Sequence, residues 1–512
     1  MSIISLSFLI FVLICMAFYY ALPKSWQWVE LLLMSLTFYC LSIAPYTLIY
    51  VVISTLSAYS AAYLCDMTKR EYSQKKFFRA VVVFTAISLN IGLWFLLKGK
   101  GFWGAVAGTS KALLISRLSQ IDLLAPLAMG YYTLQVIGYI LDCYWGVVKP
   151  QKNFFKLFLF VIFFPQLTTG PISRYGQLES LYQRHLFSYK NLTFGAQRIL
   201  WGFFKKLVIS ERVSILVNGV WSDLSNFTGY WYIIAFLLYP LQVYTDFSGC
   251  MDIVLGVAEI FGIKLPENFN SPFMSQTLQE VWQRWHISLG LWAKDYIMFP
   301  LLKSRFLVKM GADAKKKFGK RIGKLIPTAI GMLGLWLVLG VWHGEFKYII
   351  GVELWYWSML VLGETFRPML QKINQILRIR QSNFSWRLFQ RIRTYFIFAV
   401  GLVFFRVEHI REAFVYLKVM FLTFGSNPWI FFNGSVLNLG VSYIDMNLLI
   451  FSTALLIIVA ILREKDGYAR DWVAQQILPF RWGVWVMLLV IVLVYGEYGP
   501  GYDAAEFIYK GF

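Results

Sequence analysis

Two histidines lie among the apolar and aromatic residues of the second half of the chain. His343 ends the apolar stretch WLVLGVWHGEF, and His286 lies within residues 280–300, EVWQRWHISLGLWAKDYIMFP. An ionisable group at membrane depth is costly unless it faces a cavity or a partner. An imidazole, with an ordinary pKa of about 6.5, is well suited to take a proton from a hydroxyl near neutral pH. We therefore predict that His343 is a general base; packing through a hydrogen bond to a neighbouring helix is the alternative.

The stretch around His286 alternates bulky aromatic residues with single charges. At 100° per residue its large apolar residues gather on one face, so we expect a continuous amphipathic helix over 280–300. The apolar face consists of Trp282, Trp285, Leu289, Trp292 and Tyr296. Anchoring at the headgroup level explains the Trp and Tyr residues. It does not explain the charged residues Arg284, Lys294 and Asp295, which favour a substrate-binding or channel-lining role.

Polar residues interrupt two further apolar stretches. Asp246 lies at the end of an apolar run, and an Asp at membrane depth is expected to be paired or functional. Residues 164–175 insert Thr-Thr-Gly-Pro and an arginine between apolar segments, which indicates a broken or re-entrant element. We expect these interruptions to line a shared path.

The composition indicates that membrane-spanning helices position these residues. Apolar residues are 58% and charged residues 15% of the 512, against roughly 25% charged in a soluble domain. The 48 Lys and Arg exceed the 27 Asp and Glu, giving a net charge of +21. Apolar runs of about 20 residues, long enough to cross a bilayer core, recur along the chain. These features exclude a soluble enzyme, a disordered protein and a disulfide scaffold.

Hydropathy and length predict an all-α polytopic membrane protein with about eleven spans. The predicted spans are 3–22, 28–43, 46–64, 78–97, 122–146, 229–248, 326–342, 346–363, 394–406, 447–462 and 483–498. The semi-polar stretches expected at the interface, or as short helices within the bundle, are 154–165, 194–218, 250–262, 276–300 and 412–424. Because no repeat or soluble linker is visible, residues 1–512 are expected to form a single integral membrane domain.

Basic loops predict the orientation, because Lys and Arg near span ends stay in the cytoplasm. Lys and Arg residues within 69–76 follow the third span, whereas the turn at 42–45 is uncharged, so the N-terminus is expected outside. Basic clusters within 303–324 and 367–393 should then both be cytoplasmic. Residues 326–366 must therefore run from the cytoplasmic side toward the outer side and back as two helices, with His343 near the turn. Attraction to anionic lipid explains such clusters. Nucleic-acid binding is excluded because no binding module lies between them.

The sequence predicts neither a metal site nor a disulfide framework. The five cysteines are scattered without C-x-x-C spacing, and the chain has only four histidines. Phosphate-binding loops, G-x-S-x-G elbows and H-E-x-x-H helices do not occur. We therefore expect no permanently bound cofactor.

Taken together, these motifs resemble the membrane-bound O-acyltransferase (MBOAT) family, in the bacterial branch of alginate O-acetylation and D-alanyl-teichoic-acid transfer proteins. The succession of W-x-R-W-H-x-S-L and W-H-G is the most specific feature, and the motif core covers about 160–350. The motifs are PQLTTGPISRY (165–175), YTDFSGCMD (244–252), PENFNSP (266–272), WQRWHISLGLWAKDYIMFP (282–300), VWHG (341–344) and EFIYKGF (506–512).

The resemblance implies a ring of membrane helices around a thin, partly polar centre. It makes His343 the catalytic residue and puts His286 beside the pathway. The residues at motif positions that we assign to the substrate path are Asp246, Arg284, Trp282, Trp285, Asp295 and Trp342. The implied donor is cytoplasmic, acetyl-CoA or an acyl carrier thioester. The implied acceptor is a cell-surface polysaccharide, reached through an extracytoplasmic acyltransferase partner in the acetylating systems.

We therefore expect an O-acyltransferase of the bacterial plasma membrane that transfers an acyl group, most simply acetyl, to a hydroxyl. Residues 345–347, Glu-Phe-Lys, replace the small or aromatic residues that usually follow W-H-G, which leaves the acyl group and acceptor open. D-alanyl transfer to teichoic acid is the alternative within the family. A transporter or channel lined by His343 is the alternative outside it, although the inverted-repeat halves common in transporters are not visible.

Overall fold

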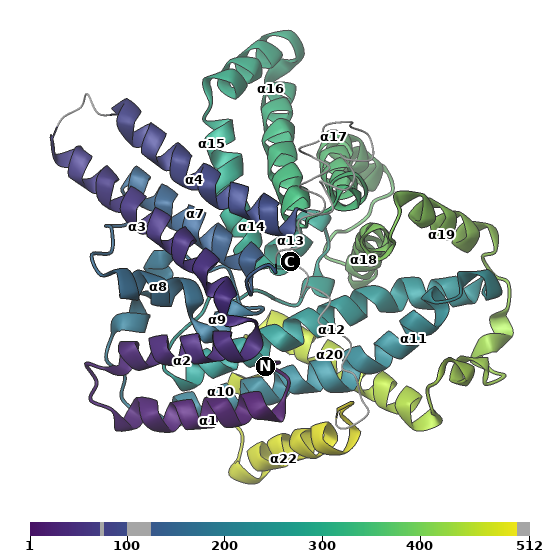
Figure 1. Cartoon of the computed structure of the whole chain (residues 1–512). Coiled ribbons are helices and arrows are strands. Elements are labelled where there is room, and N and C mark those ends of the chain that lie inside the picture. The colour runs from purple at the N-terminus through teal and green to yellow at the C-terminus, as the bar shows by residue number, and fades with distance from the viewer. Residues whose placement is uncertain (72–75, 100–123, 499–512) are drawn as a thin grey trace. The chain divides into compact units, whose positions relative to one another are not determined.

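The computed structural model describes residues 1–71, 76–99 and 124–498, and this part of the chain is helical (Figure 1). The predicted all-α class is confirmed for these residues. The chain-end motif at 506–512 and the first two residues of the expected span 122–146 lie outside them. The described chain groups into two compact units. Unit 1 contains Met1–Ile199 and Cys250–Glu267, and unit 2 contains Leu200–Gly249 and the described residues from Asn268 onward.

Unit 1 is built from two groups of helices. In one group α3, α4 and α7 pack side by side, and Asn90 on α4 donates a 2.8 Å hydrogen bond to the Ser57 hydroxyl on α3. In the other, Phe8 of α1 packs edge-on against Phe38 of α2. The helices are α1 (Leu6–Ala21), α2 (Gln27–Ser42), η1 (Pro45–Thr47), α3 (Leu48–Glu71), α4 (Lys76–Lys98), α7 (Met129–Trp145), α8 (Phe154–Ile162), α9 (Phe164–Leu167), η3 (Tyr175–Tyr182) and α10 (Tyr189–Phe203), the last as far as Ile199.

The break predicted at 164–175 is confirmed in unit 1. Helix α9 ends at Leu167, and the chain is then non-helical until η3 begins at Tyr175. At Gly170 the backbone returns so closely that an added Cβ would lie 2.2 Å from the Gln166 Cα. A glycine is therefore required at this turn.

Unit 2 holds both histidines of interest. Its elements are η4 (Phe204–Ser210), α11 (Glu211–Trp221), η5 (Leu224–Asn226), α12 (Tyr230–Ile260) as far as Gly249, η6 (Pro272–Met274), α13 (Leu278–Arg284), α14 (Ile287–Ala293), η7 (Lys294–Met298), α15 (Phe299–Leu302), α16 (Arg305–Trp342), η8 (Tyr348–Glu353), α17 (Leu354–Ile376), α18 (Phe384–Arg406), α19 (Ile410–Leu422), η9 (Pro428–Phe431), η10 (Ser435–Leu439), α20 (Tyr443–Asp466), α21 (Ala469–Ala474) and α22 (Leu478–Tyr495). The segments η4, η7 and η8 are π-helical, a wider winding that is frequent at functional sites.

Helix α16 reverses direction within its length. Gly319 has φ 85° and ψ 171°, a conformation open to glycine, and it separates a basic arm from the apolar arm that ends at Trp342. The two arms pack together, because an added Cβ at Gly311 would lie 3.1 Å from the Gly323 carbonyl oxygen. Figure 1 shows this reversal at the outer end of α16.

The helix pair predicted over 326–366 is present. The apolar arm of α16 packs against η8 and α17, and the Trp357 indole on α17 donates a 2.9 Å hydrogen bond to the Ala329 carbonyl on α16. His343 lies at the turn between the two helices. The pairing follows from two apolar segments joined by a short polar turn.

Six described helices are long and apolar enough to cross a membrane, which supports a multi-pass membrane protein. They are Pro45–Met67, Lys76–Lys98, Arg305–Trp342, Phe384–Arg406, Tyr443–Lys465 and Leu478–Tyr495. The count of about eleven spans and the single domain over 1–512 stay predictions.

One boundary differs from expectation. The span 229–248 and the stretch 250–262 were expected to be separate, yet α12 runs without interruption from Tyr230 to Ile260. The reason lies at Gly249, where an added Cβ would lie 2.9 Å from the Gly202 carbonyl oxygen. The glycine permits close packing of two helices here instead of breaking one.

Candidate functional site

His343 lies directly after the last residue of α16, and its side chain is 11% exposed. Aromatic rings surround the imidazole. Ring centroids lie 4.9 Å away for Trp342, 5.4 Å for Tyr348 and 6.2 Å for Phe405. Burial of this kind favours the uncharged imidazole, the form that can accept a proton.

A buried carboxylate, Glu353, faces His343 from η8, the segment that packs against the end of α16. The Glu353 Oε1 lies 3.6 Å from the His343 Nε2, and the Glu353 side chain is 3% exposed. Glu353 was not among the predicted site residues. An acidic residue within the apolar stretch 346–363 was the signal for it, because buried ionisable groups in such stretches are rare and functional.

The helix expected over 280–300 is interrupted at His286, so the prediction of a continuous helix there is wrong. Helix α13 ends at Arg284, Trp285 is extended, and His286 adopts the left-handed conformation with φ 45° and ψ 50° before α14 begins. The backbone there pairs with another segment: the Ile287 N–H donates to the Asn268 carbonyl at 3.0 Å. This pairing replaces the helical hydrogen bonds that periodicity predicted.

Asn268 also holds the His286 side chain. The Asn268 Nδ2 lies 3.2 Å from the His286 Nδ1, and the Asn268 Oδ1 accepts hydrogen bonds from the Ser288 N–H and hydroxyl at 2.9 Å each. The His286 Nε2 is buried and has no hydrogen-bond partner among the described residues. The Nε2 nitrogen of His286 is therefore available for a hydrogen bond to a further group.

Trp342 brings the two histidines together. Its ring contacts the His343 ring at 4.9 Å and the His286 ring at 6.3 Å between centroids, and Phe247 of α12 meets His286 edge-on at 4.9 Å. Burial, and secondarily the nearby His343, lowers the pKa of His286 to about 3. His286 is therefore uncharged at neutral pH and can donate or accept a hydrogen bond.

Asp246 belongs to a buried ion cluster in unit 2. The Lys206 Nζ lies 2.6 Å from an Asp246 oxygen and 2.6 Å from a Glu211 oxygen, and all three side chains are at most 2% exposed. Beside them, the Lys205 ammonium donates 2.9 Å hydrogen bonds to the Ser248 carbonyl and hydroxyl. Asp246 was expected to be paired or functional, and the structure shows it paired, with partners that hold α12 against η4. Its assignment to the substrate path stays a prediction.

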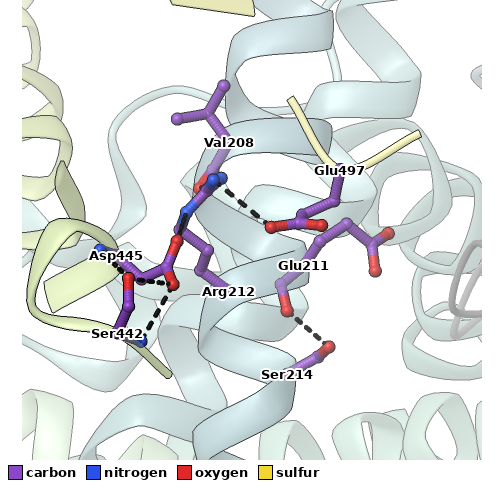
Figure 2. A network of polar contacts seen from close by, with 7 residues as sticks. All are labelled: Val208, Glu211, Arg212, Ser214, Ser442, Asp445 and Glu497. Carbon is purple, nitrogen blue, oxygen red and sulfur yellow. Dashed lines mark hydrogen bonds and ion pairs between the residues drawn. The ribbon is translucent and has the colours of Figure 1, made fainter. Parts of the chain in front are cut away.

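A second polar network is centred on Arg212 of α11 (Figure 2). Arg212 pairs with Asp445 of α20 at 2.9 Å and with Glu497 at 3.3 Å. Asp445 also accepts hydrogen bonds from the Ser442 N–H and hydroxyl at 2.9 and 2.7 Å. The network joins three distant parts of the chain and is structural. Sequence reasoning missed it, along with Lys205, Lys206 and Glu211, although charges inside an apolar run were its signal.

Two further predicted residues, Trp282 and Trp285, pack against other aromatic rings. Trp282 packs on Trp336 and Tyr356 at 5.0 and 4.7 Å between ring centroids. Trp285 packs on Phe398 at 5.1 Å. These tryptophans form aromatic packing behind the histidines.

The assignment of Arg284 and Asp295 to the substrate path stays a prediction. Arg284 pairs with Glu280 at 2.7 Å and with Glu464 of α20. Asp295 lies half-buried on η7. Within the described part of the chain, no group of three His, Cys, Asp or Glu residues could hold a metal ion.

Residues 151–312 match the family model of MBOAT, the membrane-bound O-acyltransferase family, and the predicted resemblance is confirmed. The match to this family therefore covers one central part of the chain. The matched segment includes His286 and ends before His343.

Three curated relatives are similar to this chain. A probable alginate O-acetylase of Pseudomonas aeruginosa is 29% identical over 305 residues, 59% of this chain and 53% of that protein. A peptidoglycan O-acetyltransferase of Helicobacter pylori is 27% identical over 332 residues, 60% and 58% of the two chains. A teichoic acid D-alanyltransferase of Bacillus subtilis is 31% identical over 235 residues, 44% and 55%. The matches thus span about half the length of these relatives.

Proposed function

We propose that this protein is a membrane O-acyltransferase that uses His343 as a general base. It transfers an acyl group, most simply acetyl, from a cytoplasmic thioester to a hydroxyl on the outer side. The hydroxyl belongs to a cell-surface polysaccharide or to a partner acyltransferase. The observation that supports this most is the pair of buried histidines whose rings both contact Trp342, in a chain whose residues 151–312 match the MBOAT family model.

The reaction follows from these groups. His343 takes the proton of the acceptor hydroxyl as its oxygen attacks the thioester carbonyl carbon. The new C–O bond forms, the C–S bond breaks, and the leaving thiolate receives the proton. General-base catalysis of this kind contributes about 10²- to 10⁴-fold in rate. His286, uncharged and beside Trp342, is placed to donate a hydrogen bond to the oxygen on which negative charge develops.

The reactants enter from opposite sides in this proposal. The basic arm of α16 carries exposed Lys and Arg residues and attracts an anionic donor, acetyl-CoA or an acidic carrier protein. Orientation with the N-terminus outside in a bacterial plasma membrane puts this arm in the cytoplasm. Holding donor and acceptor on either side of His343 keeps the reacting groups close together, which lowers the entropic cost of reaching the transition state.

D-alanyl transfer to teichoic acid is the second candidate, favoured by the 31% identity to a teichoic acid D-alanyltransferase. To separate the two, cells expressing the chain are fed labelled acetate or labelled D-alanine, and the ester recovered from the surface polymer is identified. Acetate in the ester supports the first candidate. D-alanine supports the second, and label in neither ester contradicts both.

The same assay tests the general base. His343→Ala should abolish acyl incorporation while the protein remains in the membrane at normal abundance, and His286→Ala should reduce it less. Incorporation at the wild-type level in His343→Ala contradicts the proposal. A transporter or channel would instead keep substrate flux in the absence of any thioester.

A further inference from the structure

Glu353 is the acidic group closest to the candidate base. Its Oε1 lies 3.6 Å from the His343 Nε2, slightly longer than a hydrogen bond. Hydrogen bonds in catalytic sites are often long without substrate and shorten in the complex. The 3.6 Å separation is therefore compatible with a hydrogen bond that forms in the substrate complex.

The backbone is built to bring Glu353 to this position. At Gly340 an added Cβ would lie 2.8 Å from the Ile349 Cα and 3.0 Å from the Glu353 Cγ. Only a residue without a side chain lets η8 approach α16 so closely. The π-helical winding of η8 over Tyr348–Glu353 carries Glu353 onto the face that meets His343.

The carboxylate is held in a setting that costs free energy. Glu353 is 3% exposed, its Oε2 has no hydrogen-bond partner among the described residues, and its Oε1 lies 3.6 Å from the His343 Nε2, which carries a charge only when protonated. Burying a carboxylate with an incomplete set of partners is unfavourable. Such a cost points to function when the group faces a base.

We propose that Glu353 is a positioning residue for His343. It fixes the imidazole through Nε2, so that the opposite ring nitrogen takes the proton of the acceptor hydroxyl. It then stabilises the imidazolium that forms, as the buried aspartate does in serine-protease triads. This inference rests on the proposed function.

Few other titratable groups face this pair. On η8 the Tyr348 ring lies 5.4 Å from the His343 ring, and His286 lies beyond Trp342. Glu345, in the turn, pairs with Lys347 at 3.3 Å and is half exposed. On α18 the Arg406 guanidinium lies 5.4 Å above the Tyr239 ring. Among the described groups, Glu353 is the carboxylate within reach of the imidazole.

The test compares Glu353→Gln with Glu345→Gln in the purified full chain, using a labelled acyl thioester and an acceptor. Glu353→Gln keeps the shape of the side chain but removes the charge, so we expect kcat to fall at least about 10²-fold. KM for the thioester should stay within about twofold, because donor binding is not involved. Glu345→Gln makes the same chemical change in the nearby turn and should keep wild-type kcat.

The pH profile separates positioning from packing. Burial favours the protonated form of Glu353, whereas the positioning role requires the ionised form. An ionised Glu353 makes His343 easier to protonate, so in wild type the rate falls at a higher pH on the acid side. Removing the charge should move that fall to lower pH in Glu353→Gln and leave it unmoved in Glu345→Gln. Glu353→Asp should recover part of kcat.

The outcomes separate this inference from the proposed function. Wild-type kcat, or an unmoved acid limb, in Glu353→Gln overturns the positioning role while an inactive His343→Ala still upholds the function. An active His343→Ala overturns the function itself. If Glu353→Gln does not fold, Glu353→Met, which is of similar length and uncharged, gives the same test, since a wild-type kcat and an unmoved acid limb there overturn the role.

Discussion

Two buried carboxylate sites in unit 2 differ in how fully they are paired. Asp246 and Glu211 both lie 2.6 Å from Lys206, in a cluster at most 2% exposed. Glu353 lies 3.6 Å from an imidazole that is uncharged when buried. The tightly paired cluster fixes α12 against η4, whereas the loosely paired glutamate faces the candidate base. Close charge pairing thus marks the scaffold, and incomplete pairing marks the site where charge changes during a reaction.

The largest effect is expected at the tightly paired cluster. Lys206→Ala leaves two buried carboxylates without their cation, which costs about 3–5 kcal/mol of stability. Thermal unfolding in detergent should show a sharp fall in Tm, and little folded protein should reach the membrane. His343→Ala, which removes no such pair, should keep a near-normal Tm. A normal Tm for Lys206→Ala would mean that the cluster does not support the fold.

The packing of the helix pair should give the next effect. Gly340→Ala places a Cβ 2.8 Å from the Ile349 Cα, and overpacking of this kind costs about 1–3 kcal/mol. Because η8 carries Glu353, kcat should fall as well. Gly363→Ala is the matched control on α17, where an added Cβ meets no atom within 4 Å. Equal kcat in Gly340→Ala and Gly363→Ala would mean that the close approach of η8 to α16 does not affect catalysis.

The smallest effect concerns pH and His286. Burial lowers the pKa of His286 to about 3, below its ordinary value, so the unfolded chain takes up this proton first as the pH falls. Stability present above pH 6.5 is therefore lost between about pH 6.5 and 3, with a loss of about 2 kcal/mol at pH 5 relative to pH 7. His286→Asn, which tolerates the left-handed conformation, should lose correspondingly less. Identical pH dependence of Tm in both proteins would contradict the burial of this ring.

Local patterns were enough to predict much of this fold. Apolar runs of sufficient length predicted the helices, and the basic clusters on either side of 326–366 predicted the pairing of α16 with α17. Residue type and setting also singled out both histidines, which the structure buries beside Trp342, and gave pairing as one of two expectations for Asp246. These features depend on neighbours along the chain, which a sequence displays directly.

The parts that sequence reasoning missed depend on distant partners. The break at His286 arises because residues 268–270 take over the backbone hydrogen bonds of 284–287. Helical periodicity cannot reveal such a partner. Lys206 and Glu353 were passed over because their stretches were judged by average hydropathy, although charged residues beside apolar ones were a visible signal in both. Arg284 matched a motif position, yet it pairs with Glu280 and Glu464.

The most direct test of the account is a single-turnover assay in proteoliposomes. Wild-type protein and His343→Ala, at equal folded amounts, receive a labelled acyl thioester on one side and an acceptor hydroxyl on the other. We expect ester formation in wild type and a rate lower by at least about 10²-fold in the variant. Ester formation at the wild-type rate in His343→Ala would contradict the account.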